Sequence, residues 1–112
     1  MSLAKQACLT PANGLRALNP QECAHFLDEL DDWQLTADGI LCKQLRFDNY
    51  YQTSAFVNAV IWQAHQADHH PEIRFGYREC QIELTTHVVG ALSINDFILA
   101  ARIDRLVSPY NG

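Results

Sequence analysis

Residues 49–84 read NYYQTSAFVNAVIWQAHQADHHPEIRFGYRECQIEL, and they carry the patterns of a helix and a strand pair in succession. Asn49 and Gln52 have the spacing of a helix cap and its partner. Apolar residues then recur at helical spacing, which predicts one buried face: Phe56, Ala59, Val60 and Ala64. We expect this helix to end near Ala67, because Pro71 disfavours helical backbone in the residue before it.

The second half of the same segment predicts a β-hairpin. Apolar and polar residues alternate on both sides of Arg78-Glu79, which we expect to form a tight turn. The apolar set before the turn is Ile73, Phe75 and Tyr77, and the set after it is Cys80, Ile82, Leu84 and Thr86.

Similar patterns precede this segment. A first helix is predicted to begin at Asn19-Pro20, because Asn caps free backbone N–H groups and Pro is favoured at the first helical position. A first hairpin is predicted around Asp38-Gly39, between a short strand at Trp33 and Leu35 and a second strand within residues 40–47.

A last helix is predicted from Ser93, with Asp96 at the capping-box position. The element order is then helix, hairpin, helix, hairpin, helix. This order favours an α+β fold, a four-stranded antiparallel sheet with helices packed on one face. Residues 1–18 show no sustained period and are expected to form an N-terminal arm, which leaves residues 19–112 as a single domain.

Composition narrows the class of function. The chain has 112 residues and a net charge of -5, and a nucleic-acid-binding protein usually carries a basic excess instead. No apolar run approaches the roughly 20 residues needed to span a bilayer, and no export signal is evident, so we expect a cytoplasmic protein. In that compartment the cysteines are expected to be reduced: Cys8, Cys23, Cys42 and Cys80.

Three histidines fall within six residues, at His65, His69 and His70, directly before Pro71. Three interpretations compete: a solvated helix end, a metal site built on His65 and His69 four residues apart, and acid–base catalysis. The metal interpretation lacks the Glu that follows the first His in metalloprotease helices, because Gln66 stands there. Acid–base chemistry suits imidazole, which ordinarily titrates near ~6.5.

His87 favours the catalytic interpretation. It continues the second hairpin on the face opposite to Cys80, Ile82 and Leu84, so it is not part of the apolar stripe. Because the preceding helix and this hairpin are sequence neighbours, we expect His87 to fold back towards His69.

The spacing of these residues resembles a known family signature, that of the pterin-4a-carbinolamine dehydratases. The matching positions span 32 residues and are His65, His69, His70, Pro71, Tyr77, His87 and Asp96. Further similar positions are Asp32-Trp33, Lys43-Gln44, Phe47 and Asn95-Asp96-Phe97.

The resemblance implies a dimerising α+β domain, as a homodimer or tetramer, that needs no metal or organic cofactor. Its members dehydrate 4a-hydroxytetrahydropterin to quinonoid dihydropterin, which regenerates the pterin used by aromatic amino acid hydroxylases such as phenylalanine hydroxylase. The pterin substrate would be the principal partner, and phenylalanine hydroxylase a second one.

The resemblance also implies roles for individual residues. His69 and His87 would carry the proton transfers, and His70 would chiefly hold the pterin. Substrate contacts would come from His65, Pro71, Trp33, Thr85, Thr86 and Asp96. For Trp33 a place in the core is an equal alternative, and Asp96 is better explained as the capping partner of Ser93 than as a catalyst.

One position departs from the family pattern, because His65 stands where many relatives have Glu. A neutral imidazole can orient a neighbouring ring but stabilises its charged form less than a carboxylate does. Two other functions stay open: a protein-binding dimerisation module of the same fold without catalysis, and a histidine metal site.

Overall fold

The computed structural model describes residues 2–111, with side chains as far as residue 107. Four strands form one antiparallel sheet in the order β1-β2-β4-β3. Their bounds are β1 Gln34–Leu35, β2 Leu41–Arg46, β3 Glu72–Phe75 and β4 Glu79–Leu84. The helices are α1 Pro20–Leu27, α2 Tyr50–Ala67 and α3 Ile94–Asn111. The predicted α+β fold is therefore confirmed.

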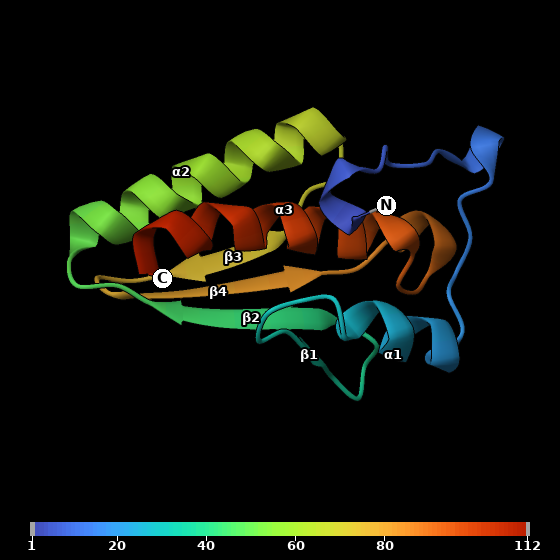
Figure 1. Ribbon diagram of the computed structural model, residues 1–112, viewed down its shortest axis with the longest axis horizontal. Coiled ribbons are helices and arrows are strands. Elements are labelled where there is room, and N and C mark those ends of the chain that lie inside the picture. The colour runs from blue at the N-terminus through green and yellow to red at the C-terminus, as the bar shows by residue number, and fades with distance from the viewer. Residues whose placement is uncertain (1, 112) are drawn as a thin grey trace.

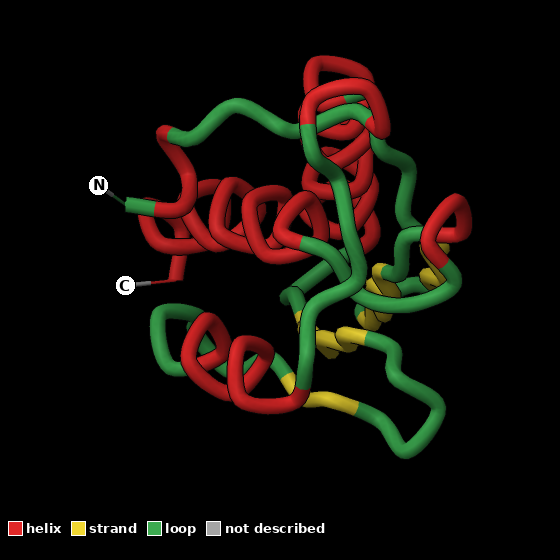
Figure 2. The backbone as a smooth tube through the Cα atoms, turned by 90° about the vertical axis from the view of Figure 1, so that its right-hand side faces the viewer, coloured by secondary structure: helices red, strands yellow, loops and turns green. Residues whose placement is uncertain are grey.

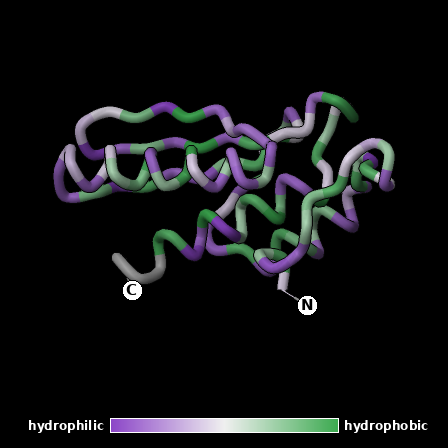
Figure 3. Tube along the Cα trace, turned by 90° about the horizontal axis from the view of Figure 1, so that it is seen from above, coloured by the Kyte–Doolittle hydropathy of each residue, from purple (hydrophilic) through white to green (hydrophobic). Residues whose placement is uncertain are grey.

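The long helices α2 and α3 stack over the same face of the sheet (Figure 1). Seen along the strands, both helices lie to one side of the sheet, and the strands form a layer of their own (Figure 2). Hydrophilic and hydrophobic residues alternate along the turns of α2, as one buried face requires (Figure 3). None of the helices within residues 2–111 is long and apolar enough to cross a membrane.

The core lies between α3 and the two central strands. Its fully buried side chains include Phe97, Leu99 and Ile103 of α3 and Leu41, Ile82 and Leu84 of the sheet. Burying one such side chain stabilises the fold by ~1.5–3 kcal/mol. The packing of α3 on the sheet therefore holds the helix, including its first turn, in place.

The predicted caps are present. Asn49 accepts a hydrogen bond from the backbone of Gln52 at the start of α2. Asn19 and Glu22 form a full capping box at α1. Hydrogen bonds from Arg16, and then from the backbone of Asn19, lower the pKa of Glu22 to about 2.

Two details differ from the expectations. The turn of the second hairpin is Gly76-Tyr77-Arg78, because Gly76 N donates to Glu79 O at 2.9 Å and Glu79 already opens β4. The predicted turn was therefore too late in the chain, and Tyr77 lies in the loop. Residues 2–18 form no strand or α-helix but lie against the domain, with Leu3 only 2% exposed.

Candidate functional site

The end of α2 sets the position of His69. Asp68 takes the left-handed backbone conformation, with φ of 50°. Its N–H donates to His65 O at 3.2 Å, and His69 N donates to Ala64 O at 3.1 Å. This hydrogen-bond pair is the Schellman arrangement that ends many helices, usually with Gly at the left-handed position. The chain therefore turns sharply at Asp68 and aims His69 away from the helix axis towards α3.

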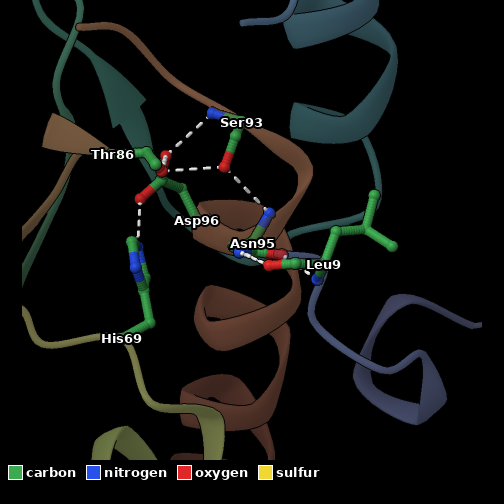
Figure 4. Close-up of polar contacts among 6 residues, drawn as sticks. All are labelled: Leu9, His69, Thr86, Ser93, Asn95 and Asp96. Atoms are coloured by element: carbon green, nitrogen blue, oxygen red, sulfur yellow. Dashed lines mark hydrogen bonds and ion pairs between the residues drawn. The ribbon is translucent and has the colours of Figure 1, made fainter. Parts of the chain in front are cut away.

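His69 meets a buried carboxylate. Its Nε2 lies 2.6 Å from Oδ1 of Asp96, and the two side chains are 12% and 0% exposed (Figure 4). Asp96 is in the first turn of α3. Burying a carboxylate is costly unless it is paired and hydrogen-bonded, so these contacts explain how Asp96 can lie inside the protein.

The second oxygen of Asp96 is equally occupied. Oδ2 accepts from Ser93 N at 2.9 Å and from Thr86 Oγ1 at 2.7 Å. Thr86 Oγ1 also lies 2.7 Å from Ser93 Oγ. Because Thr86 gives its one hydroxyl proton to Asp96, the Ser93 hydroxyl must donate to Thr86. Each side-chain oxygen of this hydrogen-bond network is then assigned as donor or acceptor. The carboxylate of Asp96 is held by three residues, namely His69, Thr86 and Ser93.

This chain of hydrogen bonds fixes the tautomer of His69. A carboxylate only accepts, so the proton of a neutral His69 ring sits on Nε2 and faces Asp96. Nδ1 is left with a lone pair, available to take a proton. The arrangement is that of the carboxylate–imidazole pairs in which the acid orients the ring and stabilises the imidazolium that forms.

Two further histidines of the motif follow residues of this hydrogen-bond network directly in sequence, His70 after His69 and His87 after Thr86. His70 is exposed, and the half-buried Pro71 leads directly into β3. His87 is exposed in the short 3-10 turn η3, His87–Val89, directly after Thr86. Thr86 N donates to Ala91 O at 3.1 Å, which closes the loop that carries His87. The hydrogen bonds of Thr86 thus tie this loop to the carboxylate that holds His69.

His65 is exposed on the last turn of α2, where its ring packs against Trp62, with centroids 5.5 Å apart. Trp62 itself is 58% exposed. No motif or pattern singles out this tryptophan, and its contact with His65 follows from their spacing of three on a helix.

Two of the expected substrate contacts, Asp96 and Thr86, have partners within the protein. Asp96 is fully buried, its Oδ1 contacts His69, and its Oδ2 completes the cap with Ser93. Thr86 is 4% exposed, and its hydroxyl is engaged by Asp96 and Ser93. Both side chains thus take part in the hydrogen-bond network that holds His69. Thr85 is half-buried.

Trp33 takes the alternative place in the core. It is 5% exposed, and its Nε1 donates to Asp104 Oδ1 at 2.8 Å. The same oxygen receives a 2.8 Å bond from Lys43, whose buried ammonium also bonds Asp31 O. Asp104 lies eight residues beyond Asp96, or about 12 Å along α3, so Trp33 bonds a different turn of this helix than His69 does.

Within residues 2–111, no three His, Cys, Asp or Glu side chains are grouped so that they could hold a metal ion. The three-histidine metal arrangement is therefore not formed. The four cysteines are free. Burial raises the pKa of the Cys80 thiol to about 11, and burial followed by the charge of Glu83 raises that of Cys42.

Comparison with known proteins identifies the family of this chain. A family model described as pterin 4 alpha carbinolamine dehydratase matches residues 16–106. The chain belongs to the pterin-4-alpha-carbinolamine dehydratase family.

Two similar family members carry the dehydratase name provisionally. A protein of Nitrosomonas eutropha is 47% identical over 106 residues, covering 94% of this chain and 93% of its own. A protein of Hydrogenovibrio crunogenus is 45% identical over 108 residues, covering 96% of each.

Solved structures of the family share the fold. A transcriptional coactivator/pterin dehydratase from Brucella melitensis superposes with a TM-score of 0.78 at 23% identity, covering 81% of this chain and 98% of its own. A pterin dehydratase-like protein, identified as a RuBisCO assembly factor of the alpha-carboxysome, has a TM-score of 0.60 at 29% identity and covers 68% and 89%.

Proposed function

We propose that the protein dehydrates 4a-hydroxytetrahydropterin to quinonoid dihydropterin and water. The observation that carries this proposal is the contact of His69 with the buried Asp96, because it prepares one imidazole for proton transfer. Family membership supplies the substrate class. After a two-electron reduction by a separate reductase, the product would again serve the aromatic amino acid hydroxylase that consumes the tetrahydropterin.

The reaction needs two proton movements. The C4a–O bond breaks, and the departing hydroxyl takes up a proton to leave as water. A ring N–H then loses a proton, so that the product is neutral. One general base and one general acid meet these needs, each contributing typically ~10²–10⁴-fold.

His69 suits the base. Its neutral ring is held with the proton on Nε2, so Nδ1 can accept the pterin proton, and Asp96 stabilises the resulting imidazolium. His87, exposed and next to Thr86, is our candidate for the acid that protonates the hydroxyl. His70 would hold the pterin beside them.

The first experiment measures loss of 4a-hydroxytetrahydropterin by ultraviolet absorbance, with and without protein and with a chelator. We expect acceleration over the spontaneous reaction that the chelator does not change. His69→Ala and His87→Ala should each lose about 10²–10⁴-fold. His25→Ala is the matched control, since His25 is an exposed histidine on α1 and should keep the full rate.

A second candidate is a protein-binding module, favoured by the likeness to the RuBisCO assembly factor. In that case the histidines would be incidental. A protein that does not accelerate the reaction, and whose His69→Ala and His87→Ala variants keep their cellular effect, would place this candidate first.

We also propose self-association through exposed sheet edges, since β3 has a free edge.

A further inference from the structure

We propose that Asn95 is a positioning residue, which fastens an N-terminal strap against the first turn of α3 and thereby holds Asp96 in register with His69. The strap is defined as residues 3–9. Its catalytic consequence rests on the proposed dehydratase function, whereas its effect on the His69 ring does not.

The strap is attached to α3 at several points. Leu3 is buried in the core, in the 3-10 turn η1, Leu3–Lys5. Arg102 of α3 donates from Nε to Ala4 O at 3.1 Å and from Nη2 to Gln6 O at 2.7 Å. These contacts hold the first half of the strap along the middle of the helix.

Asn95 fastens the other end. Its Oδ1 accepts from Leu9 N at 2.8 Å, and its Nδ2 donates to Leu9 O at 2.9 Å. One amide side chain thus satisfies both backbone groups of a single residue. Asn95 is 5% exposed and Leu9 is half-buried, so losing this pair would leave both backbone groups of Leu9 without their side-chain partner.

Asn95 and Asp96 are consecutive and face opposite sides of the helix start. Figure 4 shows the side chain of Asn95 turned towards Leu9, while that of Asp96 is turned towards His69 and Thr86. The Asn95 backbone N–H also donates to Ser93 Oγ at 3.2 Å, the hydroxyl that supports Thr86. A shift of this turn would therefore move the carboxylate and its supports together.

Such a shift matters for catalysis more than for folding, because a misplacement of about 1 Å can cost about 10²-fold in rate. The strap lies before residues 16–106 and thus outside the residues that the family model matches, and our proposal gives it the role of positioning Asp96.

The test uses the full-length chain with Asn95→Ala, Asn95→Asp and Arg102→Ala. Arg102→Ala is the matched control, since it also removes two hydrogen bonds to the strap backbone, but away from Asp96. Three readouts are taken: the ring nitrogen signals of His69 by NMR, hydrogen exchange of the Leu9 amide, and kcat and KM of the dehydration.

For Asn95→Ala we expect faster Leu9 exchange, shifted or broadened His69 ring signals and a kcat lowered at least about tenfold, with KM within about twofold. Asn95→Asp keeps the acceptor for Leu9 N but places a carboxylate oxygen against Leu9 O, so it should change the same readouts in the same direction. If Asn95→Ala does not fold, the His69 ring signals of Asn95→Asp test the proposal in its place. Arg102→Ala should lower stability but leave the His69 signals and kcat unchanged.

The proposal is overturned if a folded Asn95 variant has the His69 ring signals of the wild type. It is equally overturned if Arg102→Ala lowers kcat as much, because loss of stability alone would then explain the effect. Should the wild-type protein prove inactive on the pterin, the dehydratase function fails, and the His69 and Leu9 signals still decide the role of Asn95.

Discussion

Replacing Asp96 by Asn tests the central feature of the site with an isosteric change. The carboxylate accepts from His69 on one oxygen, and from Thr86 and Ser93 on the other. An amide has one acceptor and one donor end. Turning the NH₂ towards Ser93 N–H would leave that buried N–H without an acceptor, at ~1–3 kcal/mol. We therefore expect the amide oxygen to face Ser93 and Thr86, and the NH₂ to face His69.

This orientation of the amide switches His69 to its other tautomer. With a donor opposite it, His69 Nε2 must become the acceptor, and the ring proton moves to Nδ1, where the base is needed. The loss should then approach the full contribution of general base catalysis, ~10²–10⁴-fold in kcat, or about 3–5 kcal/mol of transition-state stabilisation. The free energy of unfolding should fall much less than this loss of transition-state stabilisation, because Ser93, Thr86 and His69 each keep a hydrogen-bond partner.

Dehydration rates, urea unfolding and the ring nitrogen signals of His69 measure the three parts of this prediction. The matched control is Asp104→Asn, the same change eight residues further along α3, where the carboxylate bonds Trp33 and Lys43. It should lower stability and leave the rate within about twofold. A folded Asp96→Asn protein with near wild-type rate, or an Asp104→Asn protein equally impaired, would refute the assigned role of Asp96.

The remaining predictions concern the surroundings of the site and the rest of the fold. Asp68→Val should lower stability by ~1–2 kcal/mol by urea unfolding and reduce kcat by displacing His69, whereas Asp68→Gly should keep both, since Gly favours the left-handed backbone. His65→Glu should move the acid limb of the pH–rate profile to higher pH, and an unchanged profile would contradict this. Glu22 has its pKa lowered to about 2 in the folded protein, so its stabilising effect is complete above pH ~4.5 and is lost as the pH falls towards 2. The urea midpoint difference between wild type and Glu22→Gln should therefore shrink over that range, and a constant difference would count against the Arg16 contact. Cys80, with its pKa raised to about 11, should resist iodoacetamide at pH 8 unless the protein unfolds, and rapid labelling in the native state would contradict its burial.

The parts of the fold that sequence predicts well are those set by near neighbours. The cap at Asn49, the end of α2 at Ala67 and the alternation through Cys80 all involve contacts within a few residues. The turn of the second hairpin was misplaced because Tyr77 continues the apolar alternation, although the bond from Gly76 to Glu79 already closes the turn.

Contacts between segments far apart in the sequence could not be predicted from the sequence patterns. The bond between Trp33 and Asp104 joins residues 71 apart, and that between Leu9 and Asn95 joins residues 86 apart. Neither partner carries a periodic or motif signal that points to the other. Sequence patterns left the place of Trp33 open, and the structure shows its side chain buried in the core.

Asp96 shows why a correct local explanation can hide a functional one. The spacing from Ser93 accounts for the residue as a capping partner, and the structure contains that bond. Yet a capping bond uses only one carboxylate oxygen, and a buried carboxylate needs hydrogen-bond donors at both oxygens. The second oxygen reaches His69, 27 residues away. A capping carboxylate that lies fully inside a protein should therefore be expected to hold a second partner, and here that partner is the histidine that we propose as the general base.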